Sequence, residues 1–273
     1  RSRRRARPQG YQKVALTSLL RQFKHALHPR LDPLLSQRDR WRAQRALAGL
    51  PDGAYSVPAS VPYRAQYASP NLIRAYIHDG FDGAQDPNWR VFGADDPAEY
   101  AFWAPRICPL ACLQMAIAAY TPGQEPTLWQ LVKHGLDFRG YTVRDENGHW
   151  VDHGWTYPAL VKLAARYGLT ARGQGYASIL RTCDELRRDA LVMASVTPEL
   201  GEREPQPERY GGHFVLVTGF RWQNGAPVSF TLHNPSGRYP ELQANAEIPV
   251  ARFRAAYAYR LIALSPTANP SPA

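Results

Sequence analysis

The sequence predicts an α+β fold on two observations. Apolar residues first recur at helical spacing, at 109–120 and 158–167, and strand-like runs then surround the dipeptide Asn224-Gly225, which is a hairpin signal. Helices followed by antiparallel strands are typical of the α+β class. With 273 residues, 44% hydrophobic and 21% charged, the chain can bury one sizeable core. This composition excludes fibrous and wholly disordered proteins.

A basic arm precedes this body. Residues 1–50 hold 13 Lys and Arg against 2 acidic residues, a local charge of +11, whereas the rest of the chain holds 20 against 21. Because a nucleic-acid-binding core needs a basic face, nucleic acid is not an expected partner of the neutral body. We divide the chain into an arm at 1–57, with helices at 16–27 and 37–50, a domain at 58–264 and a disordered tail at 265–273. The arm is a candidate contact for an acidic partner; the alternative is a solvated helical extension packed by its leucines.

The remaining elements follow from start and stop signals. Pro109 suits the first position of a helix that ends at 121–123, and Thr156 and Gly168 bracket the helix at 158–167. Helices are also expected at 72–78 and 128–134, strands at 149–155, 191–196, 213–220, 228–233 and 254–264, and loops at 86–100 and 202–210. The longest apolar stretch has about half of the roughly 20 residues that cross a bilayer, so we expect a soluble protein.

Cys108 is the candidate nucleophile. It directly precedes the helix at 109–120, where the helix dipole and free N–H groups favour the thiolate, the nucleophilic form of cysteine. The alternative is a buried structural cysteine. Cys112 lies one turn further into the helix and is expected in the core. With Cys183 as the third cysteine, a disulfide framework is not expected.

His213 is the candidate base, and the hairpin identifies its partner. His213 follows two glycines, which let a substrate backbone approach closely, and it opens an apolar strand. If Asn224-Gly225 form the centre of the turn, paired residues sum to 449, so that Asn234 opposes Val215 on the sheet face of His213. His233 then points to the other face. We therefore expect Asn234 to orient the imidazole, whereas a one-residue bulge would reverse this assignment. A purely structural histidine is the alternative.

Cysteine, histidine and asparagine in this order match the papain-type set of nucleophile, base and orienting amide. The segments 103–115 (WAPRICPLACLQM), 210–220 (YGGHFVLVTGF) and 233–235 (HNP) resemble the bacteriocin-processing (double-glycine) peptidase-like family of papain-fold cysteine peptidases. The resemblance implies a papain-like fold, in which an N-terminal helical part with the Cys helix packs on an antiparallel sheet bearing His and Asn. It also implies cleavage of a peptide or isopeptide bond through a thioester intermediate.

Two positions depart from the family pattern. The family has Gly after the nucleophile, where this chain has Pro109; an oxyanion hole that uses the N–H of Cys108 itself loses no donor by this change. The family also has a Gln, commonly six residues before the Cys, which completes the oxyanion hole. Phe102 stands at that position. Gln66, at the end of a segment that resembles the family's Gln segment, is the candidate donor and requires a long insertion before Cys108.

Three alternatives stay open. A catalytically silent peptide-binding relative and an acyltransferase acting through the Cys108 thioester fit the same residues. A zinc site of Cys108, Cys112, His149 and His153 is disfavoured by the long gap between the two pairs. We expect no cofactor and no metal, and a peptide or protein substrate. The compartment is open, leaning cytoplasmic, and secretion stays open because the chain begins at Arg1 rather than Met.

Overall fold

The computed structural model describes residues 28–146, 149–206 and 210–267. Its helices are α2 (Gln37–Ala46), α3 (Ile73–His78), α4 (Pro97–Trp103), α5 (Cys108–Tyr120), α6 (Leu128–Asp137), α7 (Tyr157–Arg166), α8 (Ile179–Arg187) and α9 (Val250–Ala256). Its strands are β1 (Gly53–Ser56), β2 (Tyr141–Glu146), β3 (His149–Trp155), β4 (Leu169–Gly175), β5 (Leu191–Val196), β6 (His213–Gln223), β7 (Ala226–His233), β8 (Ala246–Pro249) and β9 (Tyr257–Pro266).

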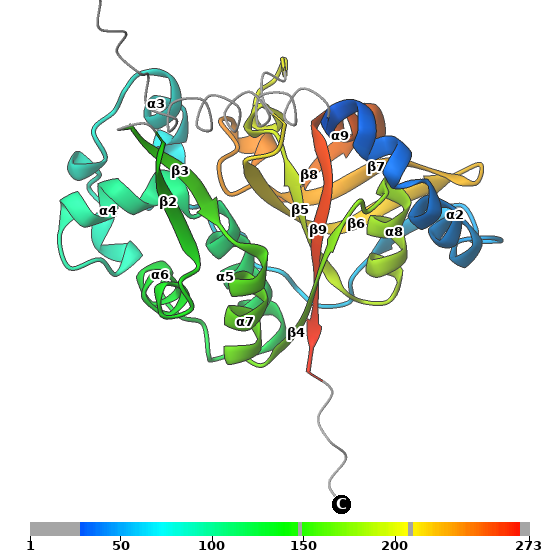
Figure 1. Cartoon of the computed structure of the whole chain (residues 1–273), viewed down its shortest axis with the longest axis horizontal. Coiled ribbons are helices and arrows are strands. Elements are labelled where there is room, and N and C mark those ends of the chain that lie inside the picture. Colours follow the sequence, from blue (N-terminus) through cyan, green and yellow to red (C-terminus); the bar gives the residue numbers. More distant parts are fainter. Residues whose placement is uncertain (1–27, 147–148, 207–209, 268–273) are drawn as a thin grey trace, which may run out of the picture.

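The chain forms a helical half and a sheet half that lie side by side (Figure 1). Helices α3 to α7 and the β2–β3 hairpin make the first, and a seven-stranded sheet carrying α2, α8 and α9 makes the second. The strand order is β4-β9-β5-β6-β7-β8, and each neighbouring pair is antiparallel. Strand β6 pairs with β7 along one edge, and with β5 and then β1 along the other. The mixed architecture agrees with the α+β expectation.

The hairpin of β6 and β7 keeps the expected register at its far end. Next to the turn, Gln223 pairs with Ala226, and the two residue numbers sum to 449. A bulge between Arg221 and Trp222 shifts the pairing by one residue, and a second irregularity between Val217 and Gly219 shifts it back. Leu216 therefore pairs with His233, as the sequence predicts. Because the two shifts cancel, Asn234 stays on the side of the sheet that His213 faces.

Helix α5 lies between the two halves and is apolar around its whole circumference. Residues 108–117 of the helix are all buried, and it contacts β5, β6 and β9 on one side and α6 and α7 on the other. A helix with no polar face belongs in the interior of a protein. Among the described residues no single helix is long and apolar enough to cross a bilayer; only 97–106 together with 108–120, bent by 87°, passes that test.

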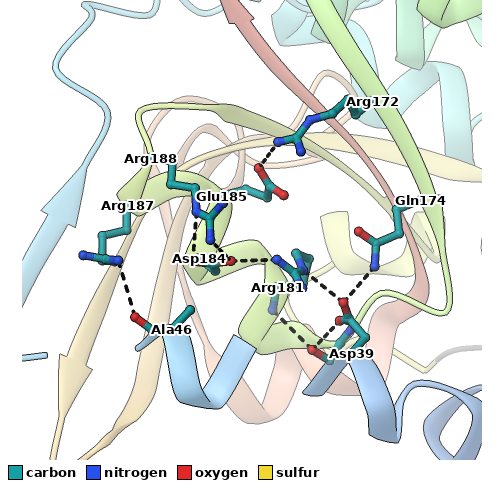
Figure 2. A network of polar contacts seen from close by, with 10 residues as sticks. Asp39, Ala46, Arg172, Gln174, Arg181, Asp184, Glu185, Arg187 and Arg188 are labelled. Atoms are coloured by element: carbon teal, nitrogen blue, oxygen red, sulfur yellow. Dashed lines mark hydrogen bonds and ion pairs between the residues drawn. The ribbon is translucent and has the colours of Figure 1, made fainter. Parts of the chain in front are cut away.

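The described part of the N-terminal arm is packed on the sheet half. Figure 2 shows Asp39 of α2 at the start of α8, where its carboxylate accepts hydrogen bonds from the backbone and hydroxyl of Ser178 at 2.8 Å each, from Gln174 Nε2 at 2.8 Å and from Arg181 Nε at 3.0 Å. Further along the arm, β1 pairs with β6. Residues 37–56 are thus integrated into the sheet half rather than standing apart from it.

Several boundaries differ from the sequence analysis. Residues 254–256, expected in the last strand, end α9, and β9 begins at Tyr257 and continues to Pro266, into the expected tail. Helix α2 ends at Ala46 instead of residue 50. Helices α4 and α8 and strands β1, β2, β4 and β8 were not predicted from the sequence. The helix expected at 16–27 lies outside the described residues.

Candidate active site

Cys108 begins α5 at the junction of the two halves. Its side chain is 8% exposed, and its sulfur accepts a hydrogen bond from the backbone N–H of Phe214, the residue after His213. One turn along the helix, Cys112 Sγ donates to the carbonyl oxygen of the same Phe214 at 3.5 Å. Two sulfurs of α5 therefore contact the backbone N–H and the backbone C=O of one residue of β6. This contact fixes the helix start beside the start of the strand.

His213 is fully buried in the cluster and is held through one ring nitrogen. Asn234 Oδ1 lies 2.8 Å from His213 Nε2, and the backbone N–H of Ser236 donates to the same oxygen at 3.1 Å. Because the amide oxygen only accepts, Nε2 carries the ring proton and donates it to Asn234. Ser236 Oγ lies 3.3 Å from Nε2 as a second, weaker partner. The neutral ring thus keeps its lone pair on Nδ1.

Burial shifts the ionisation of both reacting groups toward their neutral forms. It raises the pKa of the Cys108 thiol to about 12, against the lowering effect of the Phe214 N–H and of its own backbone N–H. It lowers the pKa of His213 to about 4, against the hydrogen bond to Asn234. From the sequence, the helix start was expected to lower the pKa of the thiol. In the folded chain, desolvation of the buried sulfur outweighs that effect, and the resting pair is thiol and imidazole.

Gln66 lies beside the same cluster. Its backbone N–H donates to the carbonyl of Pro235 at 2.9 Å, next to Asn234, and its Nε2 donates to the carbonyl of Ala104 at 3.0 Å, four residues before Cys108. The side chain is 3% exposed, and its Oε1 is buried without a hydrogen-bond partner. A hydrogen bond from the Gln66 side chain also lowers the pKa of the Tyr67 hydroxyl, against the burial that raises it. Helices α3 and α4 occupy the insertion that separates Gln66 from Cys108.

The other residues discussed at or near positions that differ from the family pattern have ordinary structural roles. Phe102 is 49% exposed and lies under the Arg106 guanidinium, 4.3 Å from its ring centre, so it is no substitute for a Gln. Pro109 is buried in the first turn of α5, where its missing N–H costs no helical hydrogen bond. His233 has its own partners on the opposite sheet face, the carbonyl of Val61 and the N–H of Asn245.

No three His, Cys, Asp or Glu side chains gather as a potential metal site within 28–146, 149–206 and 210–267. The side chain of His149, one ligand of the zinc alternative, is not among those that the structure describes. Cys108 and Cys112 instead contact Phe214, as described above.

Two residues near the base were not found by sequence reasoning. Ser236 fixes the amide of Asn234, and Arg238 donates from Nη1 to the carbonyls of Ser236 at 3.0 Å and Pro198 at 2.7 Å. Arg238 is 8% exposed and forms an ion pair with Glu202 at 2.8 Å. Both follow the His-Asn-Pro segment within a few residues, and a polar Ser-Gly-Arg run after a buried strand was the available signal.

A cavity of about 400 Å³ adjoins the Gln66 segment. Tyr63, Tyr67, Phe92 and Leu128 supply much of its apolar lining, and the ion pair of Arg64 and Glu125 (2.6 Å) lies among its lining residues. The cavity is close to the candidate nucleophile, because a charge on Cys108 contributes to the raised pKa of the Tyr67 hydroxyl, which burial brings to about 12. Its size lies toward the lower end of the range of ligand pockets.

Comparison with known proteins gives matches among solved structures alone. No protein-family model and no curated protein matches the chain. One structural match is a double-glycine-motif protease from an AMS/PCAT transporter in complex with the leader peptide, with a TM-score of 0.37 and 19% identity over 59% of this chain and 84% of that one. Another is the peptidase domain of Streptococcus ComA, a bifunctional ABC transporter involved in a quorum-sensing pathway, with a TM-score of 0.38 and 16% identity over 59% and 93%. Since both TM-scores are below 0.5, we base the functional proposal on the geometry of the site.

Proposed function

We propose that this chain is a cysteine peptidase that cleaves a peptide bond with Cys108 as nucleophile, His213 as base and Asn234 as the residue that orients the base. The contact that carries the proposal is His213 Nε2 to Asn234 Oδ1 at 2.8 Å, beside a thiol held by the N–H of Phe214. This hydrogen bond sets the imidazole tautomer with its lone pair on Nδ1, as a general base requires.

The reaction begins from the neutral pair. As Cys108 Sγ attacks the substrate carbonyl, its proton passes to His213 Nδ1, and the carbonyl oxygen becomes an oxyanion. The N–H of Cys108 and the amide of Gln66 stabilise that charge. The imidazolium then gives its proton to the departing amine, which leaves a thioester on Cys108. Water attacks the thioester, His213 accepts a proton from the water, and the acid is released as that proton returns to the sulfur.

The surroundings of the site favour a peptide substrate. The glycines at 211 and 212 have φ values of +78° and +92°, and a Cβ added at Gly212 would meet no atom within 4 Å. An extended backbone can therefore approach His213 on this side. The cavity beside Gln66 could hold one apolar side chain of the same peptide. Peptides with a double glycine before the cleaved bond are the first to test, since one matched protease acts on that motif.

Cleavage of a peptide library, read by mass spectrometry, tests this proposal. Wild-type protein and the matched control Cys183→Ala, which removes a buried thiol on α8, should cut the same peptides. Cys108→Ala should lose the cleavage entirely. Cleavage by Cys108→Ala would refute the proposal. Binding of peptides without any cleavage by the wild type would favour the silent relative, and product that forms only with added amine would favour the acyltransferase.

A further inference from the structure

Arg260 of β9 is a cation that has no charged partner among the described residues and lies beside the loop before the candidate base. No carboxylate of the described residues forms an ion pair with it, and its Nε is buried without a hydrogen-bond partner. Its guanidinium lies 5.8 Å from the ring centre of Tyr210, and its Nη2 is 3.4 Å from where a Cβ on Gly211 would stand. Gly211 is two residues before His213, so the guanidinium borders the loop that leads into the base.

A second buried polar group lies close to both Arg260 and Cys108. The hydroxyl of Tyr157, at the start of α7, is buried, and a hydrogen bond with the Ser195 side chain opposes the burial that raises the pKa of this phenol. Its ring packs against Phe214 with centres 5.5 Å apart, and Phe214 is the residue whose N–H contacts the Cys108 sulfur. Charges on Arg260 and Cys108 both act on the Tyr157 hydroxyl. Tyr157 thus connects the guanidinium with the thiol.

The sheet places a third residue, Ser195, next to Arg260 and Tyr157. Ser195 of β5 pairs with Phe214 of β6, and its hydroxyl is 3.3 Å from the Cβ position of Gly211. Arg260, Tyr157 and Ser195 therefore come from three elements and surround the peptide units just before and after His213. Beside them, the Cβ position of Gly212 is open.

Such a cluster is expensive unless something occupies it. The Arg260 side chain is partly exposed, but its Nε is buried without an acceptor, and a buried donor that lacks an acceptor destabilises the folded protein. Buried polar groups of native proteins are nearly always paired, and the exceptions gather at functional sites. A carboxylate supplies the acceptor that Arg260 Nε lacks, because it accepts two hydrogen bonds from a guanidinium, and it can accept another from a hydroxyl such as that of Tyr157.

We propose that Arg260 and Tyr157 form an anion-binding subsite next to Cys108, which holds a carboxylate of the substrate during cleavage. This inference rests on the proposed peptidase function and deepens it, since it predicts a substrate with a carboxylate near the cleaved bond. The carboxylate belongs either to an Asp or Glu side chain or to the free C-terminus of a short peptide.

Two small alkylating reagents test the subsite without a known substrate. Iodoacetate carries a carboxylate and iodoacetamide does not, and each labels Cys108 at a rate that mass spectrometry can follow. We take the ratio of the two rates relative to the same ratio for N-acetylcysteine. In the wild type we expect this relative ratio to be about 10 or more, since a hydrogen bond to a charged group contributes about 1.5–3 kcal/mol. Arg260→Gln should bring it close to 1, Arg260→Lys should retain part of it, and Arg221→Gln, on the exposed end of β6, should leave it unchanged.

Each outcome of the alkylation experiment supports or contradicts the subsite. A relative ratio near 1 in the wild type, or an unchanged ratio in Arg260→Gln, overturns the subsite while normal iodoacetamide labelling leaves the peptidase proposal standing. Inert Cys108 with both reagents contradicts both. A protection assay identifies the source of the carboxylate. Two N-acetylated tripeptides are compared for how well they protect Cys108 against iodoacetamide. One has a Glu side chain and an amidated C-terminus, and the other has neutral side chains and a free C-terminus. The better protector should lose its advantage in Arg260→Gln, and protection by neither contradicts the subsite.

Discussion

The buried neutral imidazole of His213 makes the stability of the fold depend on pH. In the unfolded chain a histidine has its ordinary pKa of 6.5, whereas burial lowers the pKa of His213 to about 4 in the folded chain. The unfolded state therefore takes up a proton first as the pH falls. Stability supplied by this group is complete above pH 6.5, declines between pH 6.5 and 4, and is lost below that range.

The magnitude follows from the two pKa values. About two and a half pH units, at about 1.4 kcal/mol each, correspond to about 3 kcal/mol of unfolding free energy. The assay is urea denaturation at pH 7 and pH 4 for the wild type and for His213→Gln, which removes the titrating group and keeps a polar side chain. His233, whose pKa burial also lowers, contributes equally in both proteins.

We expect the loss of stability between pH 7 and pH 4 to be about 3 kcal/mol smaller in His213→Gln than in the wild type. Each protein is compared with itself at the two pH values, so the free energy that the substitution itself costs at pH 7 cancels. Equal losses in the two proteins would refute the reasoning, because they would mean that His213 titrates in the folded state as it does in the unfolded chain.

Three further predictions concern single side chains. Gln66→Ala should lower kcat by about 10²–10³ with little change in KM, because it removes an oxyanion donor; an unchanged kcat measured by peptide cleavage would exclude that role. Asn234→Ala should lower kcat by roughly tenfold or more and should leave the melting temperature less affected than kcat, since it frees the ring of His213. Asp39→Ala should destabilise the fold by about 3 kcal/mol in urea denaturation, because Arg181 and the start of α8 lose a buried carboxylate, whereas Glu241→Ala, at the exposed pair with Arg203, should have no measurable effect.

Local signals were sufficient to predict the elements that carry the candidate nucleophile and base. Pro109 and the 121–123 stop bracket α5, and the Asn224-Gly225 turn positions β6 and β7. The turn alone predicts on which sheet face Asn234 lies, although two irregularities intervene. That prediction agrees with the fold because the two shifts are opposite in direction, which no local signal could have indicated.

Other features depend on tertiary contacts. The pKa of Cys108 is set by burial between α5 and β6, so the helix start alone indicates the wrong direction. Gln66 reaches the cluster across an insertion of helices, and its hydrogen bonds to Ala104 and Pro235 join segments that are distant in sequence.

Helix α8 is a different case, because its sequence did contain a local signal. Ser178 as its N-cap and the apolar spacing of Ile179, Cys183 and Leu186 were a readable helical signal that the sequence analysis did not use.

The most direct measurement of the central claim, that His213 serves Cys108 as its base, is the pH dependence of Cys108 alkylation by iodoacetamide. In the wild type, His213 can take the thiol proton wherever its ring is neutral, so the rate should be nearly constant from pH 6 to 8 and fall toward pH 4, near the lowered pKa of His213. In His213→Ala the rate should be much lower and rise about tenfold with each pH unit, as for a lone thiol of high pKa. A wild-type rate that also rises tenfold per pH unit, or a rate that His213→Ala leaves unchanged, would contradict the account.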